Sequence, residues 1–257
     1  MIHVYALCTG YLELDRASMV SDLAAGQPWT VPVLSFLVDH PHGRLLFDTG
    51  VHCRARLDPV GRLGPERVKR LTVKCEVGDD VVPQLARLGL TTADVRYVAN
   101  SHLHFDHCGG NEFFPHATFL VQRPELESAR RPGFVPNYSP SPIDFDHRLD
   151  YRMIDGEHDV FGDGTVVLLP TYGHTPGHQS LLVRAGKDAQ LVCASDACYT
   201  RENMDRDVLP KILWDASVMR ESLATLRKLR DRGGATVFYG HDPAQWEAIP
   251  HAPAPVV

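Results

Sequence analysis

Ser-His-Leu-His-Phe-Asp-His, residues 101–107, is the stretch that decides the fold. It places His102, His104, Asp106 and His107 within six positions. Residues two apart point to opposite sides of a helix, so His102 and His104 can converge on one point only from a loop. Neutral imidazoles and a carboxylate suit Zn²⁺ or a similar first-row metal ion. The motif therefore predicts a metal site rather than a polar surface loop.

Further polar residues follow apolar runs elsewhere in the chain. His174 lies in Gly-His-Thr-Pro-Gly-His after VVLLP, Asp196 follows QLVCAS, and His241 follows TVFYG. Sites in α/β proteins collect at the edges where strands end, so we expect these side chains to join the 101–107 motif. A carboxylate has two oxygens, so Asp196 can bridge two cations. We expect His178, four residues beyond His174, to support the site by hydrogen bonding rather than to bind the metal.

Short apolar runs alternate with helical patterns along the whole chain. Expected strands include 33–39, 44–48, 95–99, 118–122, 166–170, 190–195 and 236–240. Helices are expected at 79–88, 123–129 and 216–231, the last amphipathic with Asp215 as its N-cap. Residues 131–147, rich in Pro and Ser, are predicted to form the longest irregular loop. The pattern predicts one layered α/β domain over residues 1–257, with a frayed tail from about residue 250 to 257.

Composition excludes several classes of protein. The net charge is −6 without a basic run, which argues against nucleic-acid binding. No apolar stretch approaches the ~18 residues that cross a membrane. The six cysteines form no CxxC pair, and no basic leader precedes a long apolar stretch. We therefore expect reduced thiols and a cytoplasmic protein with neither a nucleic-acid nor a membrane partner.

The order of these motifs resembles the metallo-β-lactamase superfamily. HLHFDH, GHTPGH, a strand-end Asp and a strand-end Gly-His occur in that order, and the similarity runs from about residue 30 to residue 245. LLFDTG, residues 45–50, resembles the family's early motif, which gives Asp48 a role in orienting ligands. The resemblance implies an αβ/βα four-layer sandwich, with two mixed sheets inside and helices outside.

One branch of the family is closer than the rest. SHLHFDHCGGN, GHTPGHQSL, Asp-Ala-Cys-Tyr-Thr at 196–200 and FYGHD together resemble the N-acyl-homoserine lactonases, which are quorum-quenching enzymes. This resemblance implies a dinuclear hydrolase that opens a lactone ring through a hydroxide bridging two divalent metal ions. Zn²⁺ is the metal we expect, with iron, manganese and cobalt as alternatives.

The resemblance also implies a role for each site residue. The first metal is assigned to His102, His104 and His174, and the second to Asp106, His107 and His241, with Asp196 bridging both. Tyr199 is assigned as hydrogen-bond donor to the developing oxyanion, and Asp106 as the group that hands a proton to the leaving alkoxide.

The acyl part of the substrate needs an apolar groove beside the metals. We expect four side chains to line it: Phe105, Ile212, Leu213 and Trp29. The expected partner is a small-molecule lactone. The sequence leaves the oligomeric state open between a monomer and a homodimer.

Other functions remain open at this point. One is a lactonase for another small ring, such as a pyridoxine-derived lactone. Another is a thioesterase of the glyoxalase II kind, although that group carries an extra C-terminal helical segment and only 16 residues follow His241 here. A third is a non-catalytic scaffold, which the complete set of expected ligands disfavours.

Overall fold

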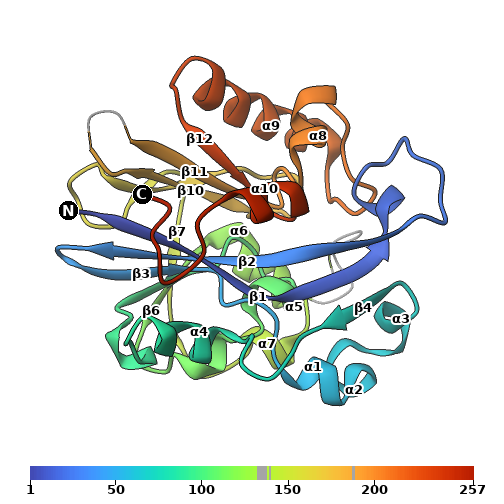
Figure 1. The fold of residues 1–257 in the computed structure, drawn as a ribbon, viewed down its shortest axis with the longest axis horizontal. Coiled ribbons are helices and arrows are strands. Elements are labelled where there is room, and N and C mark those ends of the chain that lie inside the picture. The colour runs from blue at the N-terminus through green and yellow to red at the C-terminus, as the bar shows by residue number, and fades with distance from the viewer. Residues whose placement is uncertain (132–137, 139, 187–188) are drawn as a thin grey trace.

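Two β-sheets stack face to face in the computed structural model, which describes residues 1–131, 138, 140–186 and 189–257 (Figure 1). The strands are β1 (His3–Asp15), β2 (Pro28–His40), β3 (Gly43–Phe47), β4 (Leu71–Lys74), β5 (Tyr97–Ala99), β6 (Thr118–Gln122), β7 (Asp150–Ile154), β8 (His158–Asp159), β9 (Val166–Pro170), β10 (Gln179–Arg184), β11 (Gln190–Ser195) and β12 (Thr236–Tyr239).

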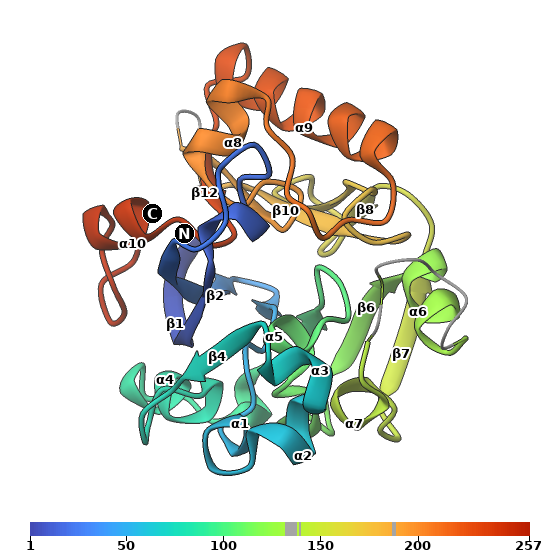
Figure 2. The same ribbon diagram turned by 90° about the vertical axis from the view of Figure 1, so that its right-hand side faces the viewer.

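Helices cover the outer face of each sheet (Figure 2). They are α1 (Arg54–Leu57), α2 (Pro59–Leu63), α3 (Pro65–Val68), α4 (Val81–Arg87), α5 (Phe105–Cys108), α6 (Arg123–Ala129), α7 (Pro142–Phe145), α8 (Arg201–Arg206), α9 (Ala216–Asp231) and α10 (Pro243–Ala248). Short 3₁₀ turns lie at Arg16–Ser18, Thr92–Asp94 and Asn111–Phe113. Helices, sheet, sheet and helices form four layers, which confirms the predicted fold class.

Both sheets are mixed. The seven-stranded sheet has the order β4-β1-β2-β3-β5-β6-β7, and the five-stranded sheet has the order β12-β11-β10-β9-β8. β3, β5, β6 and β7 are mutually parallel, as are β11 and β12, while the remaining neighbours are antiparallel. Since parallel strands end at the same edge, this topology gathers the loops that follow β3 and β5, and those that follow β11 and β12.

The sequence pattern of β2 explains why it is a central strand. Leu34, Phe36 and Val38 pack into the core between the two sheets, while Leu37 on the other face packs against α4. Strands that are buried on both faces carry near-continuous apolar runs instead of alternating ones. The second sheet is also covered on both faces. Its inner face joins the core between the sheets, and Met219, Leu223 and other apolar residues of α9 cover its outer face.

The predicted frayed tail is wrong. Val256 donates a backbone hydrogen bond to Val4 at 2.7 Å, and Val4 donates one to Val257 at 3.0 Å. Both valines also pack against the core between the sheets. Pro and Ala in the preceding HAPAP segment concealed this pairing from the sequence, since they break the alternation that marks a strand.

The predicted loop at 131–147 contains a helical turn, because α7 occupies Pro142–Phe145. Residues 132–137 and 139 of that prediction lie outside the described residues. Among the residues that the structure describes, none of the helices combines the length and the apolar character that a membrane crossing requires.

The N-terminus of α9 offers a test of how the outer layer is stabilised. The Asp215 carboxylate accepts hydrogen bonds from the backbone of Ser217 at 2.8 Å and of Val218 at 3.1 Å. We predict that Asp215→Ala lowers the free energy of unfolding by about 1 kcal/mol, because it leaves two helix-end N–H groups without their partner. Urea denaturation measures this, with Asp215→Asn as the control that keeps the cap. Equal stability of the wild type and the Ala variant would contradict it.

Candidate metal centre

The candidate ligands lie beyond strand ends at one edge of the two sheets, in loops and, for Asp106 and His107, in the short helix α5. The loop with His102 and His104 follows β5, and Asp48 follows the neighbouring parallel strand β3. Asp196 follows β11, and His241 comes two residues after its parallel neighbour β12. The loops after β11 and β12 are tied together, since the backbone N–H of His241 donates to the carbonyl of Tyr199 at 2.8 Å. Residues far apart in the sequence thus meet at one place.

Three imidazoles and one carboxylate form a first group. The Nδ1 atom of His104 lies 2.9 Å from Nε2 of His102 and 3.0 Å from Nε2 of His174. Oδ2 of Asp196 lies 3.1 Å from Nε2 of His174. One ligand atom from each of these four residues lies within 4.8 Å of all the others, a spacing that could hold a metal ion.

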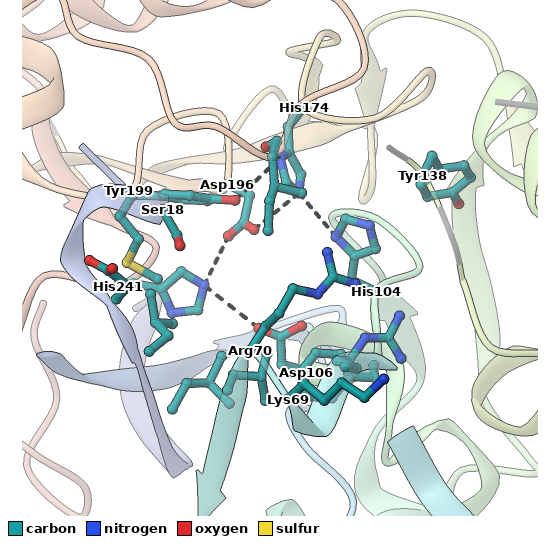
Figure 3. A pocket seen from close by; sticks show the side chains of 18 residues that line it. Ser18, Lys69, Arg70, His104, Asp106, Tyr138, His174, Asp196, Tyr199 and His241 are labelled. Atoms are coloured by element: carbon teal, nitrogen blue, oxygen red, sulfur yellow. Dashed lines mark hydrogen bonds and ion pairs between the residues drawn. The ribbon is translucent and has the colours of Figure 1, made fainter. Parts of the chain in front are cut away.

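A second group faces the opposite oxygen of the same carboxylate. Oδ1 of Asp196 lies 3.1 Å from Nε2 of His241 and 3.3 Å from Nε2 of His107. Oδ2 of Asp106 lies 3.6 Å from Nε2 of His107 and 3.8 Å from Nε2 of His241. Figure 3 shows Asp196 between His174 and His241, with Asp106 beyond them. Each oxygen of Asp196 therefore serves one group.

The ring nitrogens that point away from the centre have partners. Nδ1 of His174 lies 3.1 Å from the carbonyl of Ile212, and Nδ1 of His241 lies 2.8 Å from the carbonyl of Pro32. Nδ1 of His107 lies 2.8 Å from Oδ2 of Asp48. A ring that donates its N–H outward presents the lone pair of its other nitrogen inward, as metal-binding histidines do.

The polar atoms that face the centre fit divalent cations. Among the described residues, Nε2 of His107 and Oδ1 of Asp196 are buried without a hydrogen-bond partner. Burial, followed by repulsion from neighbouring imidazoles, holds the pKa of His102 and that of His104 well below the usual range. These rings are therefore neutral, which is the form that binds a metal. In the second group the carboxylate of Asp196 outweighs burial and raises the pKa of His107 and that of His241, so a cation bound there would displace protons. Unpartnered buried atoms around a shared carboxylate, with neutral imidazoles in the first group, match the requirements of cation binding.

Asp48 supports the second group by its contact with the outward ring nitrogen of His107. It accepts a hydrogen bond from the backbone N–H of Ser101 at 2.6 Å and from the Ser101 hydroxyl at 2.8 Å, besides its contact with His107. Asp48 and Ser195 both have a left-handed backbone, with φ of 62° and 47°. Such conformations cost roughly 1–3 kcal/mol each and persist where the surroundings fix them, typically at functional sites.

His178 and Tyr199 take different places at the site. Nε2 of His178 accepts a hydrogen bond from the backbone N–H of Asp196 at 3.1 Å, and its Nδ1 lies 3.0 Å from the Thr171 hydroxyl. His178 thus contacts the backbone of a candidate ligand from outside both groups. The ring of Tyr199 lies 5.7 Å from that of His174 and 5.5 Å from that of His241. Its hydroxyl lies beside Asp196 at the floor of a pocket (Figure 3).

That pocket has a volume of about 660 Å³, which falls in the range of small-molecule sites. Phe105 and Ile212 line it, as the sequence predicts. Leu213 and Trp29 are not among the described residues of its wall. Leu213 packs into the core beneath α9, while Trp29, a residue of β2, packs against an apolar cluster with the Arg16 guanidinium 5.1 Å from its ring.

The pocket is also lined by residues that the sequence does not predict. Leu12, Leu14, Ser18 and Met19 come from the first 30 residues, where the motif resemblance is weak. Arg67 in α3 also lines the pocket, together with Lys69 and Arg70 directly after that helix (Figure 3 labels the last two), and Tyr138 lies near His104. Glu125 lies behind the pocket and is fully buried. Neither a motif nor a strand end marks these positions, so no sequence signal separates them from ordinary surface and helix residues.

Comparisons with known proteins agree with this geometry. The sequence model of the metallo-β-lactamase superfamily matches residues 28–241. The chain is 36% identical over 257 residues to the N-acyl homoserine lactonase AttM of Azorhizobium caulinodans, covering 98% of this chain and 97% of that protein. It is 33% identical over 245 residues to an N-acyl homoserine lactonase of Bacillus cereus, covering 93% of this chain and 92% of that one.

A solved structure shows the same arrangement of elements. An N-acyl homoserine lactone hydrolase, solved with the product N-hexanoyl-L-homoserine bound at its catalytic metal centre, superposes with a TM-score of 0.89. It is 30% identical, and the match covers 98% of each chain. The family model spans most of the sequence, and relatives match it from end to end. This chain therefore belongs to the metallo-β-lactamase superfamily.

Proposed function

We propose that this protein hydrolyses the lactone ring of N-acyl homoserine lactones and so quenches quorum-sensing signals. The observation that carries the proposal is the shared Asp196 carboxylate, which offers one oxygen to each of two ligand groups at the floor of a pocket. Relatives named as N-acyl homoserine lactonases that match the chain almost from end to end support this substrate.

The proposed ligands fall into the two groups that the contacts define. His102, His104 and His174 hold the first cation, Asp106, His107 and His241 hold the second, and Asp196 serves both. When bound, a pair of divalent cations lowers the pKa of water and polarises a carbonyl group. Zn²⁺ suits this mixture of imidazole and carboxylate ligands, and iron, manganese and cobalt suit it as well.

Tyr199 supplies a hydrogen bond to the reacting carbonyl. Burial, reinforced by the nearby carboxylate of Asp196, raises the pKa of Tyr199 well above its usual range. The phenol therefore stays protonated at neutral pH and can donate to the oxyanion that forms as the carbonyl is attacked. A well-placed donor of this kind lowers the barrier by about 2.7–4 kcal/mol.

Asp106 lies in the pocket wall, where it can move a proton. Its carboxylate accepts the proton that the attacking water gives up and passes it to the ring oxygen as the ester C–O bond breaks. Phe105 and Ile212, together with Leu12, Leu14 and Met19, provide apolar surface for the acyl chain. The proposed partner is therefore a small lactone, bound by a chain that acts as a monomer or a homodimer.

All six cysteines are free thiols in the structure. Thiols stay reduced in the cytoplasm, so we place the activity there. A lactonase acting on a different small ring uses the same ligands and remains the second candidate. A glyoxalase II-like thioesterase also shares these ligands, and the panel below separates all three.

A substrate panel tests the proposal directly. We expect hydrolysis of N-acyl homoserine lactones that exceeds the hydrolysis of a pyridoxine-derived lactone, a glutathione thioester and a β-lactam, measured as kcat/KM by pH-stat or chromatography. Chelator treatment should abolish the activity, and Zn²⁺ or Co²⁺ should restore it. A higher kcat/KM for any other member of the panel would reject this substrate, and activity that survives full metal removal would reject the mechanism.

Asp196 is the residue whose loss should matter most. Asp196→Ala removes both bridging oxygens, so we predict fewer than two metals per chain and a fall in kcat/KM of about 10³-fold or more. Metal analysis and steady-state kinetics measure the two effects. Glu221→Gln, on the exposed surface of α9, serves as the control. Near-normal turnover with two bound metals would refute the bridging role.

Tyr199→Phe separates donation from packing. Loss of the hydroxyl should lower kcat by about 10²–10³-fold while the metal content stays unchanged, because the phenyl ring keeps its contacts with the histidines. The matched control is Tyr239→Phe, a buried tyrosine whose hydroxyl contacts Met204 and which is absent from the described pocket wall. An unchanged kcat would show that Tyr199 only packs.

A further inference from the structure

Glu125 is a buried carboxylate that no proposed step of the reaction uses. It lies in the first turn of α6, and its exposed fraction is 0%. Across the described residues, no basic side chain forms an ion pair with it. A buried charge without a counter-ion is costly unless hydrogen bonds satisfy it. The hydrogen bonds of this side chain therefore indicate what it does.

Four donors converge on this carboxylate, two on each oxygen. Oε1 accepts from the backbone N–H of Leu103 at 2.9 Å and from the hydroxyl of Tyr138 at 2.6 Å. Oε2 accepts from the hydroxyl of Thr175 at 2.6 Å and from the backbone N–H of Gly177 at 3.0 Å. Hydrogen bonds to an ionised acceptor are about twice as strong as neutral ones.

Three of the four donors, all except Tyr138, belong to the two loops that carry the first ligand group. Leu103 lies between His102 and His104, and Thr175 directly follows His174. The loop at 174–177 approaches α6 so closely that a Cβ atom on Gly177 would lie 2.3 Å from the backbone nitrogen of Glu125. Only glycine fits at that position. The carboxylate is therefore a direct link between two segments whose imidazoles, His104 and His174, are 70 residues apart in the sequence and have nitrogens 3.0 Å from each other.

The second ligand group has a carboxylate of its own. Asp48 contacts His107 and the backbone of Ser101, and neither is a partner of Glu125. Two buried carboxylates thus support the centre. Glu125 contacts the loops of the first group, while Asp48 contacts His107 of the second group directly and reaches His102 only through the Ser101 hydroxyl, which lies 3.0 Å from Nδ1 of that ring. This division gives the inference a specific consequence, because disturbance of one carboxylate should affect one cation more than the other.

We propose that Glu125 is a positioning residue that holds the 102–104 and 174–177 loops at the spacing at which His102, His104 and His174 share one divalent cation. The inference rests on the ligand assignment of the proposed function. Glu125 acts through the loops, since it is not among the described residues of the pocket wall. Groups that orient metal ligands typically change metal affinity by 10–100-fold when they are replaced.

Glu125→Gln is the primary test, because it keeps the volume and removes one acceptor oxygen. Whichever way the amide turns, its NH₂ group faces one backbone N–H and one hydroxyl; the hydroxyl can turn to accept, but the hydrogen bond from the backbone N–H is lost. Titration of the metal-free protein with Zn²⁺ against a chromophoric chelator should show one site weakened by about 10–100-fold and the other unchanged. Asp159→Asn is the control, since Asp159, the last residue of β8, is likewise a carboxylate that accepts from several donors: it accepts hydrogen bonds from three backbone N–H groups of the turn between β8 and β9.

Co²⁺ identifies which site is weakened. His102, His104 and His174 give the first site three imidazoles, whereas the second has two imidazoles and the Asp106 carboxylate, so their Co²⁺ absorption bands should differ. Asp48→Asn is the reciprocal variant and should weaken the second site more than the first, because its contact with His107 is direct and its contact with His102 runs through Ser101. Loss of the same band in both variants, or wild-type affinities for both metals in Glu125→Gln, would overturn the inference.

Two milder variants cover the case in which Glu125→Gln does not fold. Tyr138→Phe and Thr175→Val each remove one donor and leave the carboxylate in place, and each should weaken the same single site by a smaller factor. If both variants bind two cations as the wild type does, the inference is wrong. If the wild type itself binds no divalent cation, the proposed ligand assignment fails instead, and the two failures are thereby distinguished.

Discussion

The rest of the fold must bring two groups of ligands to the two oxygens of the Asp196 carboxylate. One oxygen lies 3.1 Å from Nε2 of His174 and the other lies 3.1 Å from Nε2 of His241. The loops after β9, β11 and β12 must therefore bring these three side chains together. A second sheet must bring the loop after β5 to the same edge. Stacked mixed sheets satisfy this geometry, because parallel pairs in each sheet end side by side while the packed core between them fixes their separation.

Buried hydrogen bonds hold the ligands in position at the place where the loops meet. Backbone carbonyls of Ile212 and Pro32 orient two imidazoles, and buried carboxylates hold the loops from which others project. Left-handed residues at Asp48 and Ser195 show that the chain accepts local strain there. Since a domain is stable by only about 5–15 kcal/mol, such strain requires well-packed surroundings, which the layers over both sheets provide.

Much of this site follows from sequence because its signals are local. Four potential ligands in six residues are hard to explain by packing, and Asp215 before an amphipathic stretch marked α9 correctly. The residues that sequence reasoning missed act over long distances. Glu125 has the appearance of an ordinary first-turn acidic residue until the fold brings Leu103 and Thr175 to it. The sequence predicts Leu213 and Trp29 in the groove because they are apolar, but apolar character alone does not distinguish a pocket wall from the core.

The pairing of Val256 and Val257 with Val4 affects more than the chain end. β4 pairs with β1 only along Tyr11–Leu14, so the earlier part of β1 would otherwise present open N–H and C=O groups at the rim of the seven-stranded sheet. An exposed strand of this kind is a template on which another molecule can add a strand. The last residues therefore occupy backbone groups on which a strand of another molecule could otherwise pair.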